Sequence, residues 1–458
     1  MKIGYLTFGR DDFSYGLSLS MQRISKEHEF FRVSPRTARY VDVLLFSCFW
    51  WEHIYVMADF LRKAEIDKSQ DLSRRPFIIV GGFNTFNPVP FGKYADAVIV
   101  GDGELTLYKL IENLDADLPG VYRDGDKSVE YQIVDPLEGY CHETNQIGRI
   151  EIARGCRYKC RFCAVTFLKP YREVPVEEIK RALVGCTVKR VALFAPEPTL
   201  HSQDKEVDDL CDIFGKTRLD TDIRLDNLGK RRDNMPRVGI EGISYKLRKS
   251  VNKAYTDEKI FTQVKKLIDA GRRGLFMYFI LDLPGEDEDD WADMVNMFEM
   301  IGEIPGAENF LLKPQPNVFM PSPHTPMEYD NIHYWRDYRS KWHRVMSKEG
   351  ERGWKVMMCE ANRVFGPTSR VLSMLSTRAG PEFKEMEEHL VRKNALNVRG
   401  GRPMSLNIKK LELYLEPFGG TEKYCGTYTE ETAPWKVVRS DKWQMSKKST
   451  KAVSPLVK

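Results

Sequence analysis

Three cysteines in the middle of the chain have the spacing of a metal centre. Cys156, Cys160 and Cys163 follow the pattern C-x3-C-x2-C, so three of the nine cysteines stand within eight residues. The odd total and the scatter of the other cysteines do not indicate a disulfide framework, and such a cluster more often binds metal. Gly155 precedes the first cysteine at the end of a strand-like run, which predicts that the thiolates lie on one short loop.

The number of thiolates distinguishes two kinds of centre. A structural zinc ion takes four protein ligands, and no His or Cys follows Cys163 at the spacing of a zinc finger. An iron–sulfur cubane held by three cysteines instead leaves one iron open to a substrate or cofactor. Basic residues flank the thiolates, where we expect them to offset an anionic cluster and to lower the thiol pKa values. They are Arg154, Arg157, Lys159 and Arg161.

The cysteine segment resembles the signature of the radical S-adenosylmethionine (SAM) superfamily. In that family an aromatic residue, here Phe162, stands before the last cysteine. Segments further along resemble other motifs of the family, and Asp282 stands where the family usually has Gly. These segments are 239–253, 278–286 and 319–326, and the resemblance covers residues 148–330.

The resemblance implies a chemistry as well as a fold. The three cysteines would hold a 4Fe–4S cluster, whose open iron would bind the amine and carboxylate of SAM. One electron from the reduced cluster would break the S–C5′ bond, and the resulting 5′-deoxyadenosyl radical would abstract a hydrogen atom from a substrate. The electron would come from a donor such as flavodoxin or ferredoxin. The implied outcome is methyl transfer or another modification at an unactivated carbon.

The resemblance also assigns residues to the SAM site. Phe162 would pack near the adenine. Ala195-Pro196-Glu197 stands where the family usually has a Gly-Gly-Glu-like motif for the methionyl amine, and the Glu197 carboxylate suits an ammonium group. Pro196 lacks an N–H but keeps its carbonyl. The alternative for Glu197 is an ordinary acid at a helix start.

Further polar residues complete this predicted SAM site. Arg224 and Asn227 follow the third predicted strand of the region and would reach the carboxylate or ribose of SAM. Glu241 would serve the ribose or the substrate end. A surface salt bridge for Arg224 and a structural role for Glu241 are the alternatives.

Residues 1–140 are predicted to form a Rossmann-like parallel sheet. Apolar strands alternate with helices such as 51–64 and 105–114, which is typical of parallel sheets. Gly81-Gly82, Gly101 and Gly103 follow two of the strands, at the edge where such sheets bind ligands. The alternative is that these glycines only make tight turns. The predicted strands are 2–8, 41–47, 76–80 and 95–100.

A second α/β region is predicted over residues 148–330, as a partial (β/α)6 barrel. Its helices include 176–183 and 257–270, and Gly271 is placed to cap the second of these. Residues 331–433 have a mainly helical pattern. Residues 434–458 are basic and are predicted to be a flexible tail. The strands expected in the barrel are 149–153, 190–194, 222–225, 237–240, 275–281 and 309–318.

The first region resembles the cobalamin-binding-type domain that accompanies part of the radical SAM family. One cobalamin signature is Asp-x-His-x-x-Gly, and this chain reads Asp11-Asp-Phe13-Ser-Tyr-Gly16. A phenyl ring has no lone pair for cobalt, so Phe13 excludes histidine ligation at that position. The domain would then either bind cobalamin without this ligand or have lost the cofactor. A related subgroup that transfers methylthio groups needs three further N-terminal cysteines for a second cluster. Only Cys48 and Cys141 stand upstream of the cysteine triplet here, so methylthio transfer is rejected.

Composition limits the remaining function classes. The net charge is +4, which gives no dominant nucleic-acid signal. The most apolar stretch, 41–61, contains charged residues, and the chain opens on a strand-like run, so we expect a cytoplasmic protein without a membrane span. Two rival interpretations stay open. One is a cobalamin-free radical enzyme that modifies a nucleobase or nucleic acid; the other is a non-enzymatic, metal-stabilised binding protein.

Overall fold

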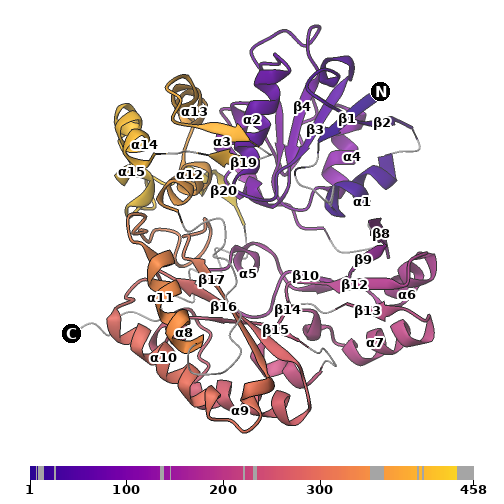
Figure 1. Cartoon of the computed structure of the whole chain (residues 1–458). Helices are drawn as coiled ribbons and strands as arrows, with labels where there is room; N and C mark the ends of the chain where they lie inside the picture. Colours follow the sequence, from indigo (N-terminus) through magenta and orange to yellow (C-terminus); the bar gives the residue numbers. More distant parts are fainter. Residues whose placement is uncertain are drawn as a thin grey trace.

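The protein consists of two α/β domains and a helical C-terminal part (Figure 1). The computed structural model describes residues 1–6, 8, 15–24, 27–134, 139–144, 146–219, 222–230, 235–350, 366–399, 402–404 and 407–440. Phe13, which bears on histidine ligation of cobalamin, lies outside the described residues, as does most of the predicted tail.

The N-terminal domain is built on a six-stranded sheet in which all strands but the last are parallel. Its inner strands read Val-Leu-Leu-Phe-Ser and Phe-Ile-Ile-Val-Gly, because helices cover both of their faces. The strand order is β2(Glu29–Arg32)-β1(Lys2–Leu6)-β3(Val43–Ser47)-β4(Phe77–Gly81)-β5(Ala97–Ile99)-β6(Val121–Tyr122). One face packs on α1(Tyr15–Ile24) and α4(Glu104–Glu112), the other on α2(His53–Lys63).

This strand order creates a topological switch point between β1 and β3. Chains leave the carboxyl ends of these strands in opposite directions, so a crevice opens there for a ligand. The four strands expected in this domain are all present. Two strands were missed because they carry little apolar signal: β2 reads Glu-Phe-Phe-Arg and is largely exposed, and β6 has two residues.

The second domain confirms the predicted partial barrel. Its parallel strands form two sheets, β9(Ile147–Glu151)-β12(Arg190–Phe194)-β13(Thr217–Arg218) and β14(Asp222–Ile223)-β15(Arg237–Glu241)-β16(Gly274–Leu281)-β17(Leu311–Val318). The outer helices are α6(Val176–Gly185), α7(Asp204–Ile213), α8(Tyr245–Ser250), α9(Asp257–Asp269) and α10(Glu288–Gly302). Gly271 has φ +66°, as a residue that ends α9 requires.

The barrel is open at both edges. Strand β17 contains Pro314 and Pro316, which have no N–H for a further strand, so it ends the sheet. At the other edge, β8(Cys141–Thr144) pairs antiparallel with β9 and connects the two domains along the chain.

The C-terminal part packs against the N-terminal domain. Tyr55 Oη donates to the carbonyl of Leu372 at 2.7 Å, and Asn87 Nδ2 donates to the carbonyls of Thr377 and Ala379 at 3.1 and 3.0 Å. Figure 1 shows the helices after residue 366 beside the indigo domain, whereas the helix of residues 338–350 lies against α10 of the barrel. The elements are α11(Tyr338–Gly350), α12(Pro367–Arg378), α13(Phe383–Arg392), the hairpin β18(Asn397–Arg399)-β19(Arg402–Met404), α14(Ile408–Leu415) and α15(Glu422–Cys425).

The predicted start of the tail at residue 434 is wrong for residues 434–440. Trp435 is fully buried, and its Nε1–H donates to Glu328 at 2.7 Å. Strand β20(Val438–Arg439) then pairs in parallel with β7(Val129–Glu130) of the N-terminal domain. The basic composition predicted a flexible tail for this segment. The burial of one aromatic ring and the pairing of two strand residues instead fix it to the rest of the protein.

Asp282 has a structural role that its departure from the family pattern did not reveal. It adopts φ +66°, a conformation that suits Gly and that Asp also tolerates. Its buried carboxylate accepts from the Arg370 guanidinium, from Tyr338 Oη at 2.7 Å, and from His333 N at 3.0 Å. The side chain therefore ties the end of β16 to the C-terminal part.

Glu286 lies beside this network and makes stability depend on pH. Burial raises its pKa to about 7, although Trp291 Nε1 and Asp282 N donate to it at 3.0 and 2.7 Å. Because this pKa is higher in the folded than in the unfolded state, the carboxyl contributes stability at pH values below its unfolded-state pKa. That contribution is lost as the pH rises through 7. We expect Glu286→Gln to reduce the fall in stability between pH 5 and 8, by up to about 2 kcal/mol for a half-buried group. Urea unfolding curves at both pH values measure it, and equal slopes for variant and wild type would contradict it.

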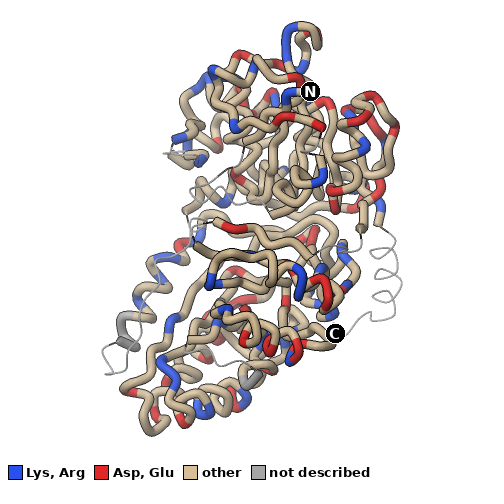
Figure 2. The backbone as a smooth tube through the Cα atoms, turned by 90° about the vertical axis from the view of Figure 1, so that its right-hand side faces the viewer, with Lys and Arg blue, Asp and Glu red and all other residues tan. Residues whose placement is uncertain are grey.

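Charges of both signs are spread over the molecule. Figure 2 shows Lys and Arg interspersed with Asp and Glu in the upper and lower halves. Among the described residues, no helix has the length and apolar character needed to cross a bilayer.

Candidate active site

The cluster loop is held at the mouth of the barrel by backbone contacts. It follows β10(Ala153–Arg154) and ends at α5(Ala164–Leu168). Gly155 has φ +69°, and a Cβ there would lie 2.2 Å from the carbonyl oxygen of Pro170, so only Gly fits. Arg161 N donates to the carbonyl of Val251 at 3.1 Å, and Asn252 Nδ2 donates to that of Lys159 at 2.9 Å. The loop is thereby fastened to the end of α8.

The three thiols line one cavity but are more widely spaced than the ligands of a single zinc ion. Tetrahedral zinc, with Zn–S bonds of about 2.3 Å, would hold its sulfurs about 3.8 Å apart. Among the described residues, the sulfurs of Cys156, Cys160 and Cys163 do not all lie within 4.8 Å of one another. All three nevertheless line a cavity of about 500 Å³. This donor set fits a 4Fe–4S cluster better than a single zinc ion.

The expectation that flanking basic residues lower the thiol pKa values is wrong. Burial raises the pKa of Cys156, and it raises that of Cys163 to about 11. Arg154 faces away from the thiols into a buried ion network, and the guanidinium of Arg157 lies over the Tyr171 ring, 4.4 Å from its centroid. Desolvation therefore outweighs charges that are near only in sequence.

The cation beside the three thiols comes from a residue that directly follows strand β14. Arg224 Nη1 lies 3.7 Å from Cys160 Sγ. The guanidinium sits 3.7 Å from the ring centroid of Tyr158 and 5.3 Å from that of Tyr255, and these cation–π contacts fix its direction. A positive charge at this place stabilises the thiolate form of Cys160 and any anionic group that the thiols hold.

The predicted SAM residues are mostly brought together in the same cavity. Phe162, Glu197, Arg224 and Glu241 all line it. Glu197 is buried at the start of a 3-10 helix, and Thr199 Oγ1 donates to its carboxylate. Glu241 stands at a register shift of β15 with φ +71°, and Lys253 Nζ lies 2.8 Å from its Oε1.

Two predicted residues lie outside this lining. Ala195 packs at the edge of a hydrophobic core, and Asn227 is buried with an Nδ2 that has no hydrogen-bond partner among the described residues. Sequence reasoning missed lining residues on later strands, among them Asp222, Tyr278 and Asn317. In β17 the polar residues Lys313, Gln315 and Asn317 alternate with apolar ones, and this sequence signal could have found Asn317. Strand β16 reads Gly-Leu-Phe-Met-Tyr-Phe-Ile-Leu and carries no such signal for Tyr278.

A second cavity, of about 580 Å³, lies at the switch point of the N-terminal sheet. Gly81, Gly82, Gly101 and Gly103 line it, so the glycine turns predicted as a binding edge do border a cavity. Gly82 has φ +112°, and a Cβ there would lie 2.5 Å from the carbonyl of Cys48. Much of the remaining lining is aromatic and includes Phe8, Tyr15, Phe46, Phe49, Trp50, Phe83 and Phe194.

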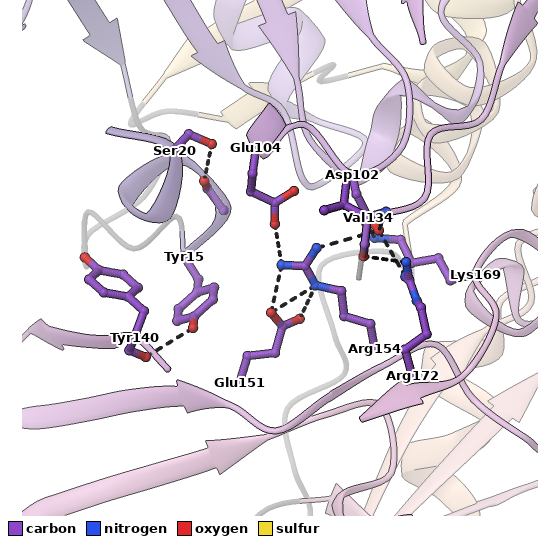
Figure 3. A network of polar contacts seen from close by, with 11 residues as sticks. Tyr15, Ser20, Asp102, Glu104, Val134, Tyr140, Glu151, Arg154, Lys169 and Arg172 are labelled. Carbon is purple, nitrogen blue, oxygen red and sulfur yellow. Dashed lines mark hydrogen bonds and ion pairs between the residues drawn. The ribbon is translucent and has the colours of Figure 1, made fainter. Parts of the chain in front are cut away.

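A buried ion network joins this second cavity to the cluster loop (Figure 3). Arg154, two residues before Cys156, binds Glu104, lies 2.9 Å from Glu151 and is 3.6 Å from Asp102. Lys169 Nζ lies 2.8 Å from Asp102. Burial opposes ionisation of Asp102, but Lys169 and Arg154 outweigh it and hold its pKa at about 2. The network thus fixes the glycine loop of one domain against the cluster loop of the other.

The imidazole of this second cavity is already engaged. Among the described lining residues, His53 is the only histidine. Its Nδ1 accepts from Phe49 N at 3.0 Å, and its ring also bonds the backbone of Ser47. Burial lowers its pKa to about 4, so the ring is neutral. Nδ1 therefore uses its lone pair in the turn after β3 and cannot offer it to a metal.

Two family models match the chain. Residues 150–298, which contain the cluster loop and most of the barrel, match the radical SAM superfamily. Residues 19–123 match the model described as radical SAM proteins, N-terminal. The chain belongs to the radical SAM superfamily. It is therefore an enzyme, and the alternative of a non-enzymatic binding protein is wrong.

Relatives of this radical SAM enzyme come from an archaeon. An uncharacterised protein of Methanocaldococcus jannaschii is 24% identical over 60% of this chain and 67% of its own length. A second protein of that organism, named "Putative methylthiotransferase MJ0865", is 26% identical over 58% of this chain and 69% of its own.

A solved structure shares the fold. It is that of apo OxsB, described as a cobalamin-dependent S-adenosylmethionine radical enzyme, with a TM-score of 0.50 at 14% identity. The match covers 91% of this chain and 65% of the OxsB chain, so this chain spans slightly less than two thirds of OxsB.

Proposed function

We propose that Cys156, Cys160 and Cys163 hold a 4Fe–4S cluster and that the barrel cavity binds SAM beside it. The observation that carries this proposal is the convergence of three thiols and a buried carboxylate, Glu197, on one cavity of a radical SAM domain. When bound, the cluster supplies the electron that cleaves SAM into methionine and a 5′-deoxyadenosyl radical.

The residues of the cavity act by binding and by excluding water. Glu197 accepts a hydrogen bond from the methionyl ammonium, and Phe162 packs beside the adenine. Arg224 keeps positive charge at Cys160 Sγ, 3.7 Å away, which favours the more negative state of the group that the thiols hold. The Glu241–Lys253 pair, with 2.8 Å between its charged atoms, offers both charges to the far end of SAM or to the substrate.

The second cavity is proposed to bind cobalamin. Its place at the switch point of a parallel sheet, its aromatic lining and its link through Arg154 to the cluster loop support this. OxsB, whose fold this chain shares, is a cobalamin-dependent enzyme. Because His53 is engaged and Phe13 replaces the signature histidine, cobalamin would bind here without an imidazole ligand from either position.

The proposed reaction is methyl transfer or another modification at an unactivated carbon of the substrate. A flavodoxin or ferredoxin would donate the electron. Methylthio transfer is not proposed, although one relative has that activity in its name. Upstream of the cluster loop the chain has only Cys48, which is fully buried, and Cys141, too few cysteines for a second cluster.

Anaerobic reconstitution tests the proposed function. The purified chain is loaded with iron and sulfide, reduced with dithionite and mixed with SAM. We expect about four irons per chain and the release of 5′-deoxyadenosine. A chain that binds iron in this ratio but forms no 5′-deoxyadenosine would refute the SAM chemistry and leave the cluster standing.

Cobalamin binding is tested by filling the second cavity. A Cβ on Gly81 would meet only Ile99, at 3.7 Å, so a side chain fits at Gly81 and points into free space. We expect Gly81→Leu to lower the amount of cobalamin that the protein retains after gel filtration by at least about 10-fold, because the added side chain would occupy the pocket. The formation of 5′-deoxyadenosine should continue. Gly366→Leu, where nothing lies within 4 Å, is the control. Equal cobalamin in Gly81→Leu and wild type would show that this cavity is not the site.

A further inference from the structure

A second group of cysteines lies away from the cluster, at the outer edge of the barrel. Cys141 is the first residue of edge strand β8, and Cys186 follows directly on α6. Cys141 and Glu143 are two residues apart, so their side chains project from the same face of the strand. One ligand atom from each of Cys141, Glu143 and Cys186 lies within 4.8 Å of the others.

The fold reserves space for the two sulfurs. Gly148 of β9 lies opposite Glu143 in the antiparallel pair. A Cβ on Gly148 would lie 2.6 Å from Cys186 Sγ and 2.7 Å from Cys141 Sγ. Any larger residue at this position would push the sulfurs apart, so Gly148 keeps both of them on one point.

The carboxylate is oriented toward the same point. Thr187 N donates to Glu143 Oε1, and Thr187 Oγ1 donates to Glu143 Oε2, each at 2.5 Å. Lys216 Nζ donates to the carbonyls of Cys186 and Val188 at 2.6 and 3.0 Å and fixes the turn that presents Cys186. Such partners outside the ligands are what orient a metal site.

We propose that Cys141, Glu143 and Cys186 bind a zinc ion that clips edge strand β8 to the end of α6. Two thiolates and one carboxylate are ligands that zinc accepts. The site has one protein ligand fewer than a usual structural zinc site, so water takes the fourth position, as it does in zinc sites with three protein ligands. Binding releases the two thiol protons to solvent and involves no change of oxidation state. The donor spacing matches a single ion here, in contrast to the wider cluster thiols.

The proposed ion would steady the connection between the two domains. Strand β8 leads from the N-terminal domain into the barrel, and Tyr140, next to Cys141, accepts a hydrogen bond from Tyr15 Oη at 3.1 Å. Tyr15 lines the second cavity. The clip is thus placed to hold one wall of that cavity. The zinc site does not rest on the proposed function, because none of its ligands lines either cavity.

The test measures zinc and iron together in the cluster-loaded chain, kept anaerobic with a reductant. After dialysis against micromolar zinc and desalting, we expect about one zinc per wild-type chain. Cys141→Ser and Cys186→Ser should retain at least about 10-fold less zinc with unchanged iron. Cys211→Ala removes a buried cysteine elsewhere in the same hydrophobic core and should retain zinc as wild type does.

Glu143→Gln guards against a variant that fails to fold, because Glu143 is only half-buried. We expect Glu143→Gln to lose its zinc at a chelator concentration about 10-fold lower than the one that wild type requires. A cluster-loaded wild type without zinc overturns the proposal. The proposal is also overturned if Cys186→Ser retains zinc as wild type does. The same holds if Cys160→Ala loses the zinc and Cys186→Ser does not, because the zinc would then lie at the other cysteine group.

Discussion

Replacing Cys160 by alanine should abolish 5′-deoxyadenosine formation while leaving the fold intact. Cys160 is one of three thiols on the cavity, and its Sγ is the one that Arg224 approaches at 3.7 Å. We expect a loss of at least about 100-fold, because even partners outside the ligand shell of a metal cost about 10–100-fold when removed. The iron content after reconstitution should fall with the activity.

Stability should change little in this variant, since the Cys160 side chain is only partly buried and the loop is held by backbone contacts. Thermal unfolding monitored by circular dichroism measures this. Cys211→Ala is the matched control, because it removes a cysteine that lines neither cavity. If Cys160→Ala kept both its iron and its 5′-deoxyadenosine, the assignment of the cluster ligands would be wrong.

Asp282→Ala should be the most destabilising single change outside the cavities. The side chains of Asp282 and Arg370 are 1% and 0% exposed, so the substitution leaves a buried guanidinium without its counter-charge. Breaking such a pair costs about 3–5 kcal/mol. We expect a loss of this size in the free energy of unfolding from urea titration, together with earlier detachment of the C-terminal part, detected by limited proteolysis.

The control for this prediction is Asp269→Ala, which removes an exposed partner of Lys265 one helical turn away. An exposed pair of this kind contributes about 0.3–0.5 kcal/mol. Asp282→Asn keeps an acceptor for Tyr338 and should fall between the two. Equal losses for Asp282→Ala and Asp269→Ala would mean that the buried network does not anchor the C-terminal part.

Local features of the chain were predictable because they depend on neighbours in sequence. The cysteine pattern spans eight residues, so spacing alone predicts a short loop and makes its three thiols the candidate ligands. Strands such as β3, β4 and β12 are continuous apolar runs, and Gly271 ends α9 for a purely local backbone reason. These features identified both the fold class and the superfamily.

Contacts across the sequence were decided only by the tertiary structure. Arg224 reaches Cys160 from another strand, whereas Arg154, two residues from a ligand, turns into the network with Glu104 and Asp102. Trp435 shows the same limit, because its indole N–H donates to Glu328, a residue far away in the sequence.

What the sequence by itself determined is therefore the candidate cysteine triad and the α/β framework, since both depend on short spacings and periodic apolar runs. The tertiary structure decided which charge stands at the thiols, where the second cavity lies, and that Cys141 and Cys186 meet beside Gly148. The physical reason is that packing brings together side chains that are far apart in the chain, and burial then determines which of the neighbouring charges act on a site.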